Sequence, residues 1–531
     1  MLRVVDHVTL KWFEFRTESF LRYRPQQPVL PVPDKSFRPR PLGHAVTAAS
    51  LPGTGSFPGI GGSGAARKPS DTATVSLAER GWRAVDSLPM RRMGFYAVMW
   101  FVFIRFSLIS EIMTEIMGAR AFMVMFFGPP TIVLCILSGG LIRTFRTKQA
   151  VFYGSYLLWL VLTIPFSVWK GGTVSLLKSA FLTEFSMFFM VAGLVYTLRD
   201  VDLIAQAISL AGSVDVLALL AFGHSGNGRF SMPFGTLQNP NDLAIHLIVI
   251  LPFVLRTLAI SGSWGWRLVG IPTFFMGLYF VFLTGSRTAV LVLAVIALFV
   301  FVRASMSQRM VLVGVTVVTL VVSVFLVPKV TLQRYLTIFG GQPAEIVDVH
   351  EYEGAIGSTE ARKNLLRNSL RLTLENPIFG VGPGMFSVGD ADQAKGDGRK
   401  ASWQVTHNTY TEVSSESGLP AFFLFCGSLV SSMWGLNRIL VQARRRGADS
   451  ILAKMSFYLL LSTFGFSACI FFGSMAYRYY MPSLIGLITA FVFAAHRELL
   501  LPVTPSQPAS RPVPNPLARF GSQRQQERPA L

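Results

Sequence analysis

The stretch NDLAIHLIVILPFVLRTLAI (residues 241–260) is an almost unbroken apolar run, with charged side chains only near its two ends, at Asp242 and Arg256. A helix needs about 20 such residues to cross the hydrocarbon core of a lipid bilayer. Similar runs recur along the chain from about Gly94 to Ala495. The sequence therefore predicts a bundle of membrane-spanning helices.

The composition of the whole chain agrees with this prediction. Of its 531 residues, 51% are hydrophobic and only 14% are charged, and the mean hydropathy is +0.48. Soluble domains carry about 25% charged residues, and a β-barrel would show short alternating segments instead. We expect an all-α polytopic membrane protein with about twelve transmembrane helices. They are placed at 94–110, 121–141, 150–168, 173–197, 202–222, 241–260, 267–284, 288–303, 310–328, 419–438, 452–472 and 479–496.

The positive charges predict how the chain is oriented. The formal net charge is +20, and the excess lies largely in the terminal segments and in short loops. Basic residues in short loops favour the cytoplasmic side of a membrane. With the N-terminus in the cytoplasm, the count of spans puts the basic clusters at 143–148 and 444–446 on that side too. Because membrane topology accounts for the charge, nucleic acid is not an expected partner.

The two ends of the chain differ from the apolar part. Residues 1–93 are rich in Arg and Pro and then in Gly, Ser and Ala, whereas residues 499–531 are rich in Pro, Gln and Arg. These compositions favour disorder. Both ends are therefore predicted to be disordered cytoplasmic tails around a transmembrane domain at 94–498. Residues 1–93 lack the apolar segment of a signal peptide, so no cleavable signal is expected.

Residues 329–418 form a connection too long for an ordinary loop, and the span count places it on the non-cytoplasmic side. Leucines and cations on opposite faces predict a helix at 358–374, capped by Ser358 or Thr359 and ended by Asn376-Pro377. The glycines of 380–384 predict a tight loop, and residues 389–400 are predicted to be flexible. A further helix-like stretch opens at 406–408, and Gly418 ends or kinks it before the next span.

His407 is the candidate for proton transfer, because imidazole titrates near neutral pH and can accept a proton from a hydroxyl. A capping or packing histidine is the alternative. Glu412 and Glu416 follow it closely enough to assist, and Asn408 and Tyr410 are secondary candidates.

Arginines at the same predicted side of the membrane are candidates for binding an anionic substrate. Arg229 follows the fifth span, and Arg287 lies in a short glycine-containing break between two spans. Guanidinium groups match phosphate oxygens in geometry and stay charged, although arginines also extend to lipid headgroups. Arg478 is a secondary candidate, since its tyrosine neighbours are typical of an interfacial belt. Arg105 and Asp215 lie inside spans, where charges are costly, and the sequence assigns them no role.

Other patterns carry little weight. Asn239-Pro240-Asn241-Asp242 is explained by helix initiation. Asp390-Ala391-Asp392 and Asp200-Val201-Asp202 match a metal-binding Asp-x-Asp motif only in form, and no metal site is predicted. The cysteines lie in apolar spans without disulfide or metal spacing, at Cys135, Cys426 and Cys469.

Several short stretches together carry a family resemblance. They lie in order, on one predicted side of the membrane, between about Gly94 and Ala495. The chain resembles the O-antigen ligase and polymerase superfamily of bacterial membrane glycan transferases. The stretches are Arg229-Phe230, Asn239-Pro240-Asn241-Asp242, Gly285-Ser286-Arg287-Thr288, Glu360-Ala361-Arg362, Asn376-Pro377-Ile378-Phe379-Gly380-Val381-Gly382-Pro383-Gly384-Met385-Phe386, His407-Asn408-Thr409-Tyr410, Glu416-Ser417-Gly418-Leu419 and Tyr477-Arg478.

The resemblance implies an enzyme of the bacterial inner membrane with a periplasmic active site. Such enzymes move a glycan from an undecaprenyl-diphosphate carrier to an acceptor hydroxyl, without a metal, nucleotide or other cofactor. It implies catalytic roles for His407 and, more weakly, Glu416, and diphosphate binding by Arg229, Arg287 and Arg362. The expected partners are the lipid-linked glycan donor, a lipid A core or growing polysaccharide as acceptor, and membrane lipids.

Alternatives for the reaction remain open. A ligase, a polymerase of exopolysaccharide or O-antigen, and a protein O-oligosaccharyltransferase share this chemistry and differ in acceptor. A transporter of lipid-linked sugar is an alternative of a different class. Inverted repeats and residues at the bilayer midplane would favour it, whereas these candidates lie at one face.

Overall fold

A computed structural model describes residues 88–500 except 119–122, 227, 305, 308, 311, 315, 318–324, 326, 337–348, 400–401 and 447–449. Most of the predicted tails, residues 1–87 and 501–531, and most of the predicted span at 310–328 thus lie outside the described residues, whereas residues 89–93 belong to the helix that follows the first tail and residues 499–500 to the helix that precedes the second.

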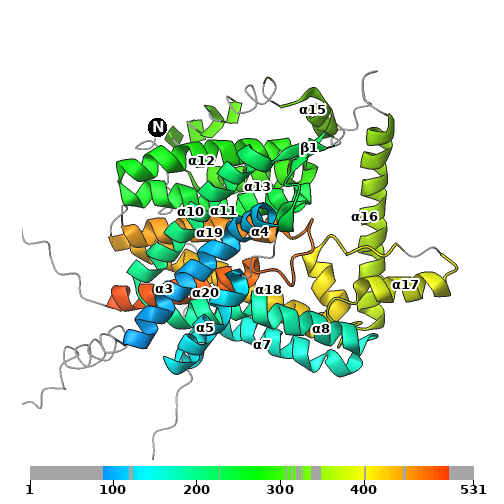
Figure 1. The fold of residues 1–531 in the computed structure, drawn as a ribbon, viewed down its shortest axis with the longest axis horizontal. Coiled ribbons are helices and arrows are strands. Elements are labelled where there is room, and N and C mark those ends of the chain that lie inside the picture. The colour runs from blue at the N-terminus through cyan, green and yellow to red at the C-terminus, as the bar shows by residue number, and fades with distance from the viewer. Residues whose placement is uncertain are drawn as a thin grey trace, which may run out of the picture.

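The described residues form a helical bundle (Figure 1). Its helices are α3 (Pro89–Phe106), α4 (Ile109–Met117), α5 (Met123–Leu137), α6 (Gly140–Thr144), α7 (Lys148–Leu162), α8 (Lys170–Ala180), α9 (Ser186–Leu194), α10 (Leu198–Phe222), α11 (Pro240–Ser261), α12 (Trp264–Leu283), α13 (Arg287–Arg303), α15 (Lys329–Leu336), α16 (Val349–Glu375), α17 (Phe386–Gly396), α18 (Thr409–Arg446), α19 (Ile451–Cys469) and α20 (Tyr480–Leu500). Short 3-10 turns are η1 (Ile164–Phe166) and η3 (Gly235–Leu237), and η2 (Phe181–Phe185) is a π turn. Strands β1 (His224–Gly226) and β2 (Arg229–Ser231) form an antiparallel hairpin.

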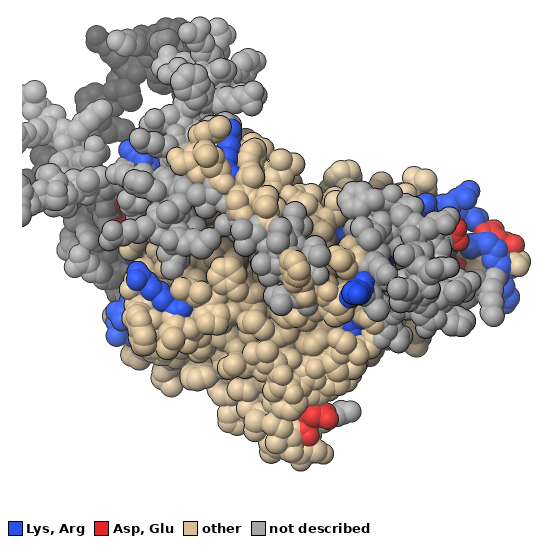
Figure 2. Space-filling view, turned by 90° about the horizontal axis from the view of Figure 1, so that it is seen from above, with Lys and Arg blue, Asp and Glu red and all other residues tan. Residues whose placement is uncertain are grey.

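Six helices of the described part are long and apolar enough to cross a membrane, or seven if α3 and α4 count as one bent span. Each predicted span apart from 310–328 overlaps a helix. Some of these helices are shorter than a full crossing requires, so the count of twelve stays a prediction. On the face that Figure 2 shows, the described surface between the two ends of the long axis is largely uncharged, as the flank of a membrane protein is expected to be.

The first predicted span is broken. Helices α3 and α4 meet at 68°, and the Leu108 N–H at the break donates to the Asp215 carboxylate (2.8 Å). This carboxylate also contacts His246 Nε2 (3.0 Å), and the other ring nitrogen of His246 contacts the Tyr480 hydroxyl (2.9 Å). Asp215, which the sequence left without a role, thus has a structural one.

The other intramembrane charge also has a partner. Arg105 of α3 forms an ion pair with Glu184, which lies in the π turn η2 between α8 and α9. The Arg105 guanidinium also lies over the Tyr479 ring, 4.6 Å from its centre. A charge inside a membrane-spanning helix is tolerated when an opposite charge pairs with it. The helical segment at 170–194 therefore continues through Glu184 without a break.

The region at 349–418 packs on one end of the bundle. There, α16 lies across the direction of α7 and α12 (Figure 1). We call this end, which also carries 223–239, 284–287 and 470–479, the loop end. A helix over 358–374 is confirmed, but it begins earlier, at Val349, so neither Ser358 nor Thr359 caps it. It ends at Glu375, directly before Asn376-Pro377, as predicted.

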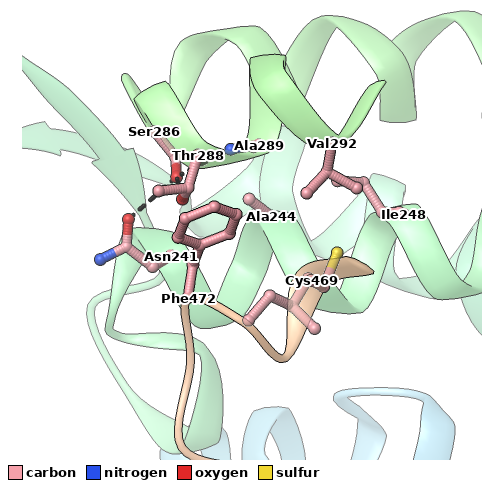
Figure 3. Close-up of a pocket in the computed structure, with 10 residues that line it drawn as sticks. Asn241, Ala244, Ile248, Ser286, Thr288, Ala289, Val292, Cys469 and Phe472 are labelled. Carbon is pink, nitrogen blue, oxygen red and sulfur yellow. Dashed lines mark hydrogen bonds between the residues drawn. The ribbon is translucent and has the colours of Figure 1, made fainter. Parts of the chain in front are cut away.

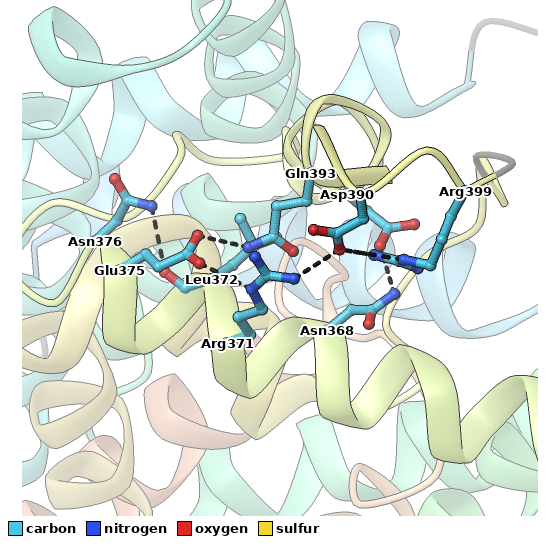
Figure 4. Close-up of polar contacts among 9 residues, drawn as sticks. Asn368, Arg371, Leu372, Glu375, Asn376, Asp390, Gln393 and Arg399 are labelled. Carbon is cyan, nitrogen blue, oxygen red and sulfur yellow. Dashed lines mark hydrogen bonds and ion pairs between the residues drawn. The ribbon is translucent and has the colours of Figure 1, made fainter. Parts of the chain in front are cut away.

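The prediction of a flexible segment at 389–400 is wrong, because most of it belongs to α17. Tertiary contacts with α16 stabilise this polar helix (Figure 4). Asn368 donates to Asp390 (2.6 Å), which also accepts from Ser402 (2.9 Å), and Arg371 pairs with Asp397 (2.7 Å). Asp390 therefore ties α17 to its neighbours.

Gly418 kinks α18, as predicted, with φ +80° and ψ 174°. A Cβ atom here would lie 1.9 Å from the Ile378 carbonyl oxygen. The kink lets the Leu419 N–H donate to the Pro377 carbonyl (2.7 Å). The turn after α16 is thereby bonded to the start of the apolar part of α18.

Candidate functional site

Arg229 joins the hairpin to two helices at the loop end. Its Nη2 donates to Asn241 Oδ1 (2.8 Å), and its Nε donates to the Thr284 carbonyl (3.1 Å). The Ser286 hydroxyl donates to the same oxygen of Asn241 (2.9 Å). Ser286 is also the N-cap of α13, so this network fixes the point at which Arg287 begins that helix.

A recess lies directly beside this network, with about 190 Å³ of empty space that includes space open to solvent. Asn241, Ser286 and Thr288 form its polar side, and apolar side chains form the rest (Figure 3). The apolar lining comes from α11, α13 and the end of α19, namely Ala244, Ile245, Ile248, Ala289, Val292, Cys469 and Phe472. The recess therefore combines an uncharged polar side with an apolar wall.

Arg362 lies within electrostatic range of both Arg287 and His407. Burial and then the charge of Arg287 lower the pKa of the Arg362 guanidinium. Burial and then the charge of Arg362 lower the pKa of the His407 imidazole from its ordinary value of 6.5. All three side chains are half-buried. The structure thus brings together residues from α13, α16 and the segment before α18.

Backbone conformation and backbone hydrogen bonds fix the position of His407. Its φ is +53°, in the left-handed region that side-chain-bearing residues seldom adopt. The His407 N–H donates to Ser474 Oγ (3.0 Å), and Thr409 Oγ1 donates to the Gly473 carbonyl (2.6 Å). Among the described residues, no hydrogen bond engages the imidazole. Strained backbone with an available imidazole is typical of functional sites.

Asn408 and Tyr410, the secondary candidates, take part in local structure. Asn408 Oδ1 accepts hydrogen bonds from the backbone N–H groups of Tyr410 (2.9 Å) and Thr411 (3.2 Å), so it caps α18. The Tyr410 hydroxyl donates to the Ser467 carbonyl (3.0 Å). Both residues therefore position the start of α18 next to His407.

Glu416 is buried and already has its hydrogen bonds. Its carboxylate accepts from the backbone N–H groups of Gly384 (2.7 Å) and Phe386 (3.1 Å) and from the Tyr477 hydroxyl (2.6 Å). The sequence predicted a catalytic role for Glu416, and that role stays a prediction. The observed contacts favour a different one, in which Glu416 holds the glycine turn and the 470–479 segment.

Arg478 is exposed at the loop end. Its charge acts on Asp242, at the start of α11, and on Glu412 of α18. Glu412 is itself buried and accepts the Ala476 N–H (3.2 Å). Arg478 thus lies next to the segments that carry the other candidates, and it remains a secondary one.

Sequence reasoning missed two residues that organise the site. Asn241 belonged to a stretch explained by helix initiation and shared with the family, and it was not a candidate site residue, although its side chain contacts Arg229 and Ser286. Tyr477 was interpreted as part of an interfacial belt, and it is a hydrogen-bond donor to Glu416. No local pattern in the sequence signals such contacts, because the partners are far apart in the chain.

Part of the chain that carries these candidate residues matches a known protein family. Residues 272–426 match the family described as O-antigen ligase. Over this segment the chain is similar to the O-antigen ligase family. This confirms the resemblance inferred from the sequence. The matched segment contains Arg287, Arg362 and His407, whereas Arg229 precedes it.

A second comparison extends over more of the chain. The teichuronic acid biosynthesis protein TuaE of Bacillus subtilis (strain 168) is 22% identical over 289 residues. The alignment covers 52% of this chain and 57% of that protein, so the chain spans little more than half of its relative. The matched segment and the apolar helices together indicate a multi-pass membrane protein.

Proposed function

We propose that the protein transfers a glycan from an undecaprenyl-diphosphate carrier to an acceptor hydroxyl on the periplasmic side of a bacterial inner membrane. The observation that carries the proposal is the proximity of His407 to Arg362 and of Arg362 to Arg287 at one end of the bundle. An imidazole of lowered pKa next to one guanidinium group, with a second guanidinium near the first, suits an anionic leaving group and a hydroxyl nucleophile.

In the proposed reaction the acceptor oxygen attacks the anomeric carbon of the glycan. The bond from that carbon to the phosphate oxygen breaks, and both electrons leave with the polyprenyl diphosphate. His407 accepts the proton of the acceptor hydroxyl. A single displacement of this kind inverts the anomeric configuration.

The arginines supply the electrostatic part of the mechanism. Negative charge builds on the diphosphate as the bond breaks, and fixed donors aimed at that charge stabilise the transition state. Arg287 and Arg362 are assigned this role, with Arg229 fixing Asn241 and the start of α13 in addition to contacting the donor. Glu416 and Tyr477 act as positioning residues for the surrounding turns.

Ligation is the first candidate for the acceptor step, because the matched family is described as O-antigen ligase. Polymerisation is a second candidate, because the relative in Bacillus subtilis is described by the biosynthesis of teichuronic acid. The two reactions differ in the acceptor, which is a lipid A core in the first and a carrier-linked glycan in the second.

Purified protein in lipid nanodiscs tests the proposal. The protein is supplied with undecaprenyl-diphosphate-linked glycan and with lipid A core, with a second carrier-linked glycan, or with an acceptor protein. We expect loss of donor and an inverted glycosidic linkage on one acceptor. Persistence of the donor with every acceptor, in a preparation that stays folded, would contradict the proposal.

A further inference from the structure

Helix α16 presents an exposed apolar row that no described part of the chain covers. Leu366, Leu370 and Leu374 recur every four residues, so they lie on one face of the helix. Their exposed fractions are 40%, 48% and 78%, and Ile378 just beyond the helix is 56% exposed. A contiguous row of leucines this exposed indicates a surface with a partner.

Basic side chains adjoin this apolar row. Lys363 and Arg367 are exposed, and each lies three residues before a leucine of the row, so they are neighbours of Leu366 and Leu370 on the helix surface. The opposite flank of α16 packs inward, where Leu365 and Leu372 are buried. The exposed face of α16 therefore combines leucines with cations.

The C-terminal end of α16 lies at the level of the outer ends of apolar helices. The Phe379 ring is stacked on Phe166, with centroids 3.7 Å apart, and on Trp159 of α7 (5.6 Å). Phe166 is itself exposed, as is Phe423 of α18. Leu374 and Ile378 therefore continue the exposed apolar flank of the bundle.

We propose that this face of α16 lies on the surface of the membrane and binds acidic phospholipid. Apolar side chains with adjacent cations are typical of helices that lie in the headgroup region, with leucines in the acyl boundary and cations on the phosphates. Figure 1 agrees, because α16 runs across the direction of the spanning helices, as a helix on the bilayer surface does. Arg362 lies one turn before Leu366, so the lipid contact ends next to the candidate site.

Spin labels on single cysteines test this inference without any assay of activity, so its failure is distinct from failure of the proposed function. The native cysteines are replaced by alanine, and labels are placed at Leu370→Cys, at Leu374→Cys and at Asn364→Cys, an exposed position outside the apolar row. Collision of each label with oxygen, which partitions into lipid, is compared with collision with a water-soluble nickel chelate in nanodiscs.

We expect a several-fold higher ratio of oxygen to nickel collisions at 370 and 374 than at 364. We also expect this difference to grow when acidic phospholipid is added, and the double variant Lys363→Gln/Arg367→Gln to lose that growth. Equal collision ratios at all three labels would overturn the proposal. Ratios at 370 and 374 that do not change when acidic phospholipid is added would overturn it as well. Magnetic broadening between labels on two copies of the chain would overturn it too, because it would assign the face to self-association.

Discussion

The Tyr477 hydroxyl lies 2.6 Å from Glu416 Oε2 and donates a hydrogen bond to it. This bond joins the segment between α19 and α20 to α18, and through the other contacts of Glu416 it reaches the glycine turn at 380–386. His407 directly precedes α18, and its N–H donates to Ser474 in the segment between α19 and α20. The position of the imidazole therefore depends on a contact at some distance from the reacting atoms.

The first prediction concerns this contact. Tyr477→Phe leaves the buried Glu416 carboxylate with one donor fewer, which costs about 1–3 kcal/mol. We expect a lower thermal unfolding temperature in detergent. Tyr153→Phe is the control, because Tyr153 is buried and its hydroxyl makes no hydrogen bond with the described residues. If Tyr477→Phe unfolds at a temperature no lower than the control, the hydrogen bond between Tyr477 and Glu416 contributes little to stability.

The second prediction concerns pH. His407 acts as a base only when neutral, so turnover should fall as the pH drops through its pKa, which burial and Arg362 hold below 6.5. Arg362→Gln removes a positive charge near the imidazole, so the pKa rises and the acidic limb of the pH–rate profile moves to higher pH. Rates for a single turnover measured between about pH 5 and 8 report this shift.

Lys395→Gln is the control for this prediction, because Lys395 is an exposed cation on α17 that does not act on His407. Its profile should match that of the unaltered protein. An acidic limb that stays in place in Arg362→Gln, or moves to lower pH, would refute the assigned role of Arg362.

The third prediction separates charge from geometry at Arg287. Arg287→Lys keeps the positive charge but loses the planar pair of donors that fits a diphosphate. We expect a fall in kcat of about 10²–10³, as for loss of a donor to a developing oxyanion, with a smaller change in donor binding. Arg267→Lys, near the start of α12 and far from Thr284 at its end, serves as the control. Full turnover in Arg287→Lys would leave diphosphate binding unsupported.

The fourth prediction concerns the kink in α18. Gly418→Ala places a Cβ atom 1.9 Å from the Ile378 carbonyl oxygen, at a φ of +80°. Gly262→Ala also has a positive φ, of +63°, but its ψ is −10° where that of Gly418 is 174°, and no atom lies within 4 Å of its added Cβ. A left-handed backbone alone costs about 1–2 kcal/mol. Gly418→Ala adds the clash with Ile378 and a backbone conformation that only glycine adopts readily, so it should unfold at a distinctly lower temperature than Gly262→Ala. Equal temperatures would contradict this account of the kink.

The features of the fold that local patterns encode could be predicted from the sequence. Apolar runs located the helices, Asn376-Pro377 located the end of α16, and Gly285-Ser286-Arg287 located the start of α13. The prediction failed at α17, because the polar residues at 386–396 form a helix only with the support of α16. It also missed the break before α4, which depends on Asp215 more than a hundred residues away.

In the candidate site, too, some residues could be predicted from the sequence and others could not. His407 and the arginines could be picked out because imidazole and guanidinium groups are few at the loop end, and their spacing matched a known family. Asn241 and Tyr477 could not, since their roles arise from contacts across the bundle. Glu416 illustrates the converse, because the family resemblance suggested chemistry and its contacts favour a positioning role.

The most direct test of the account is the release of undecaprenyl diphosphate from a lipid-linked glycan by purified protein and by His407→Ala in nanodiscs. Loss of a general base lowers rates by about 10²–10⁴, so we predict that the variant stays folded, still binds the donor and turns it over at least about a hundred times more slowly. Release at the rate of the unaltered protein would contradict the central claim that His407 accepts the proton of the acceptor.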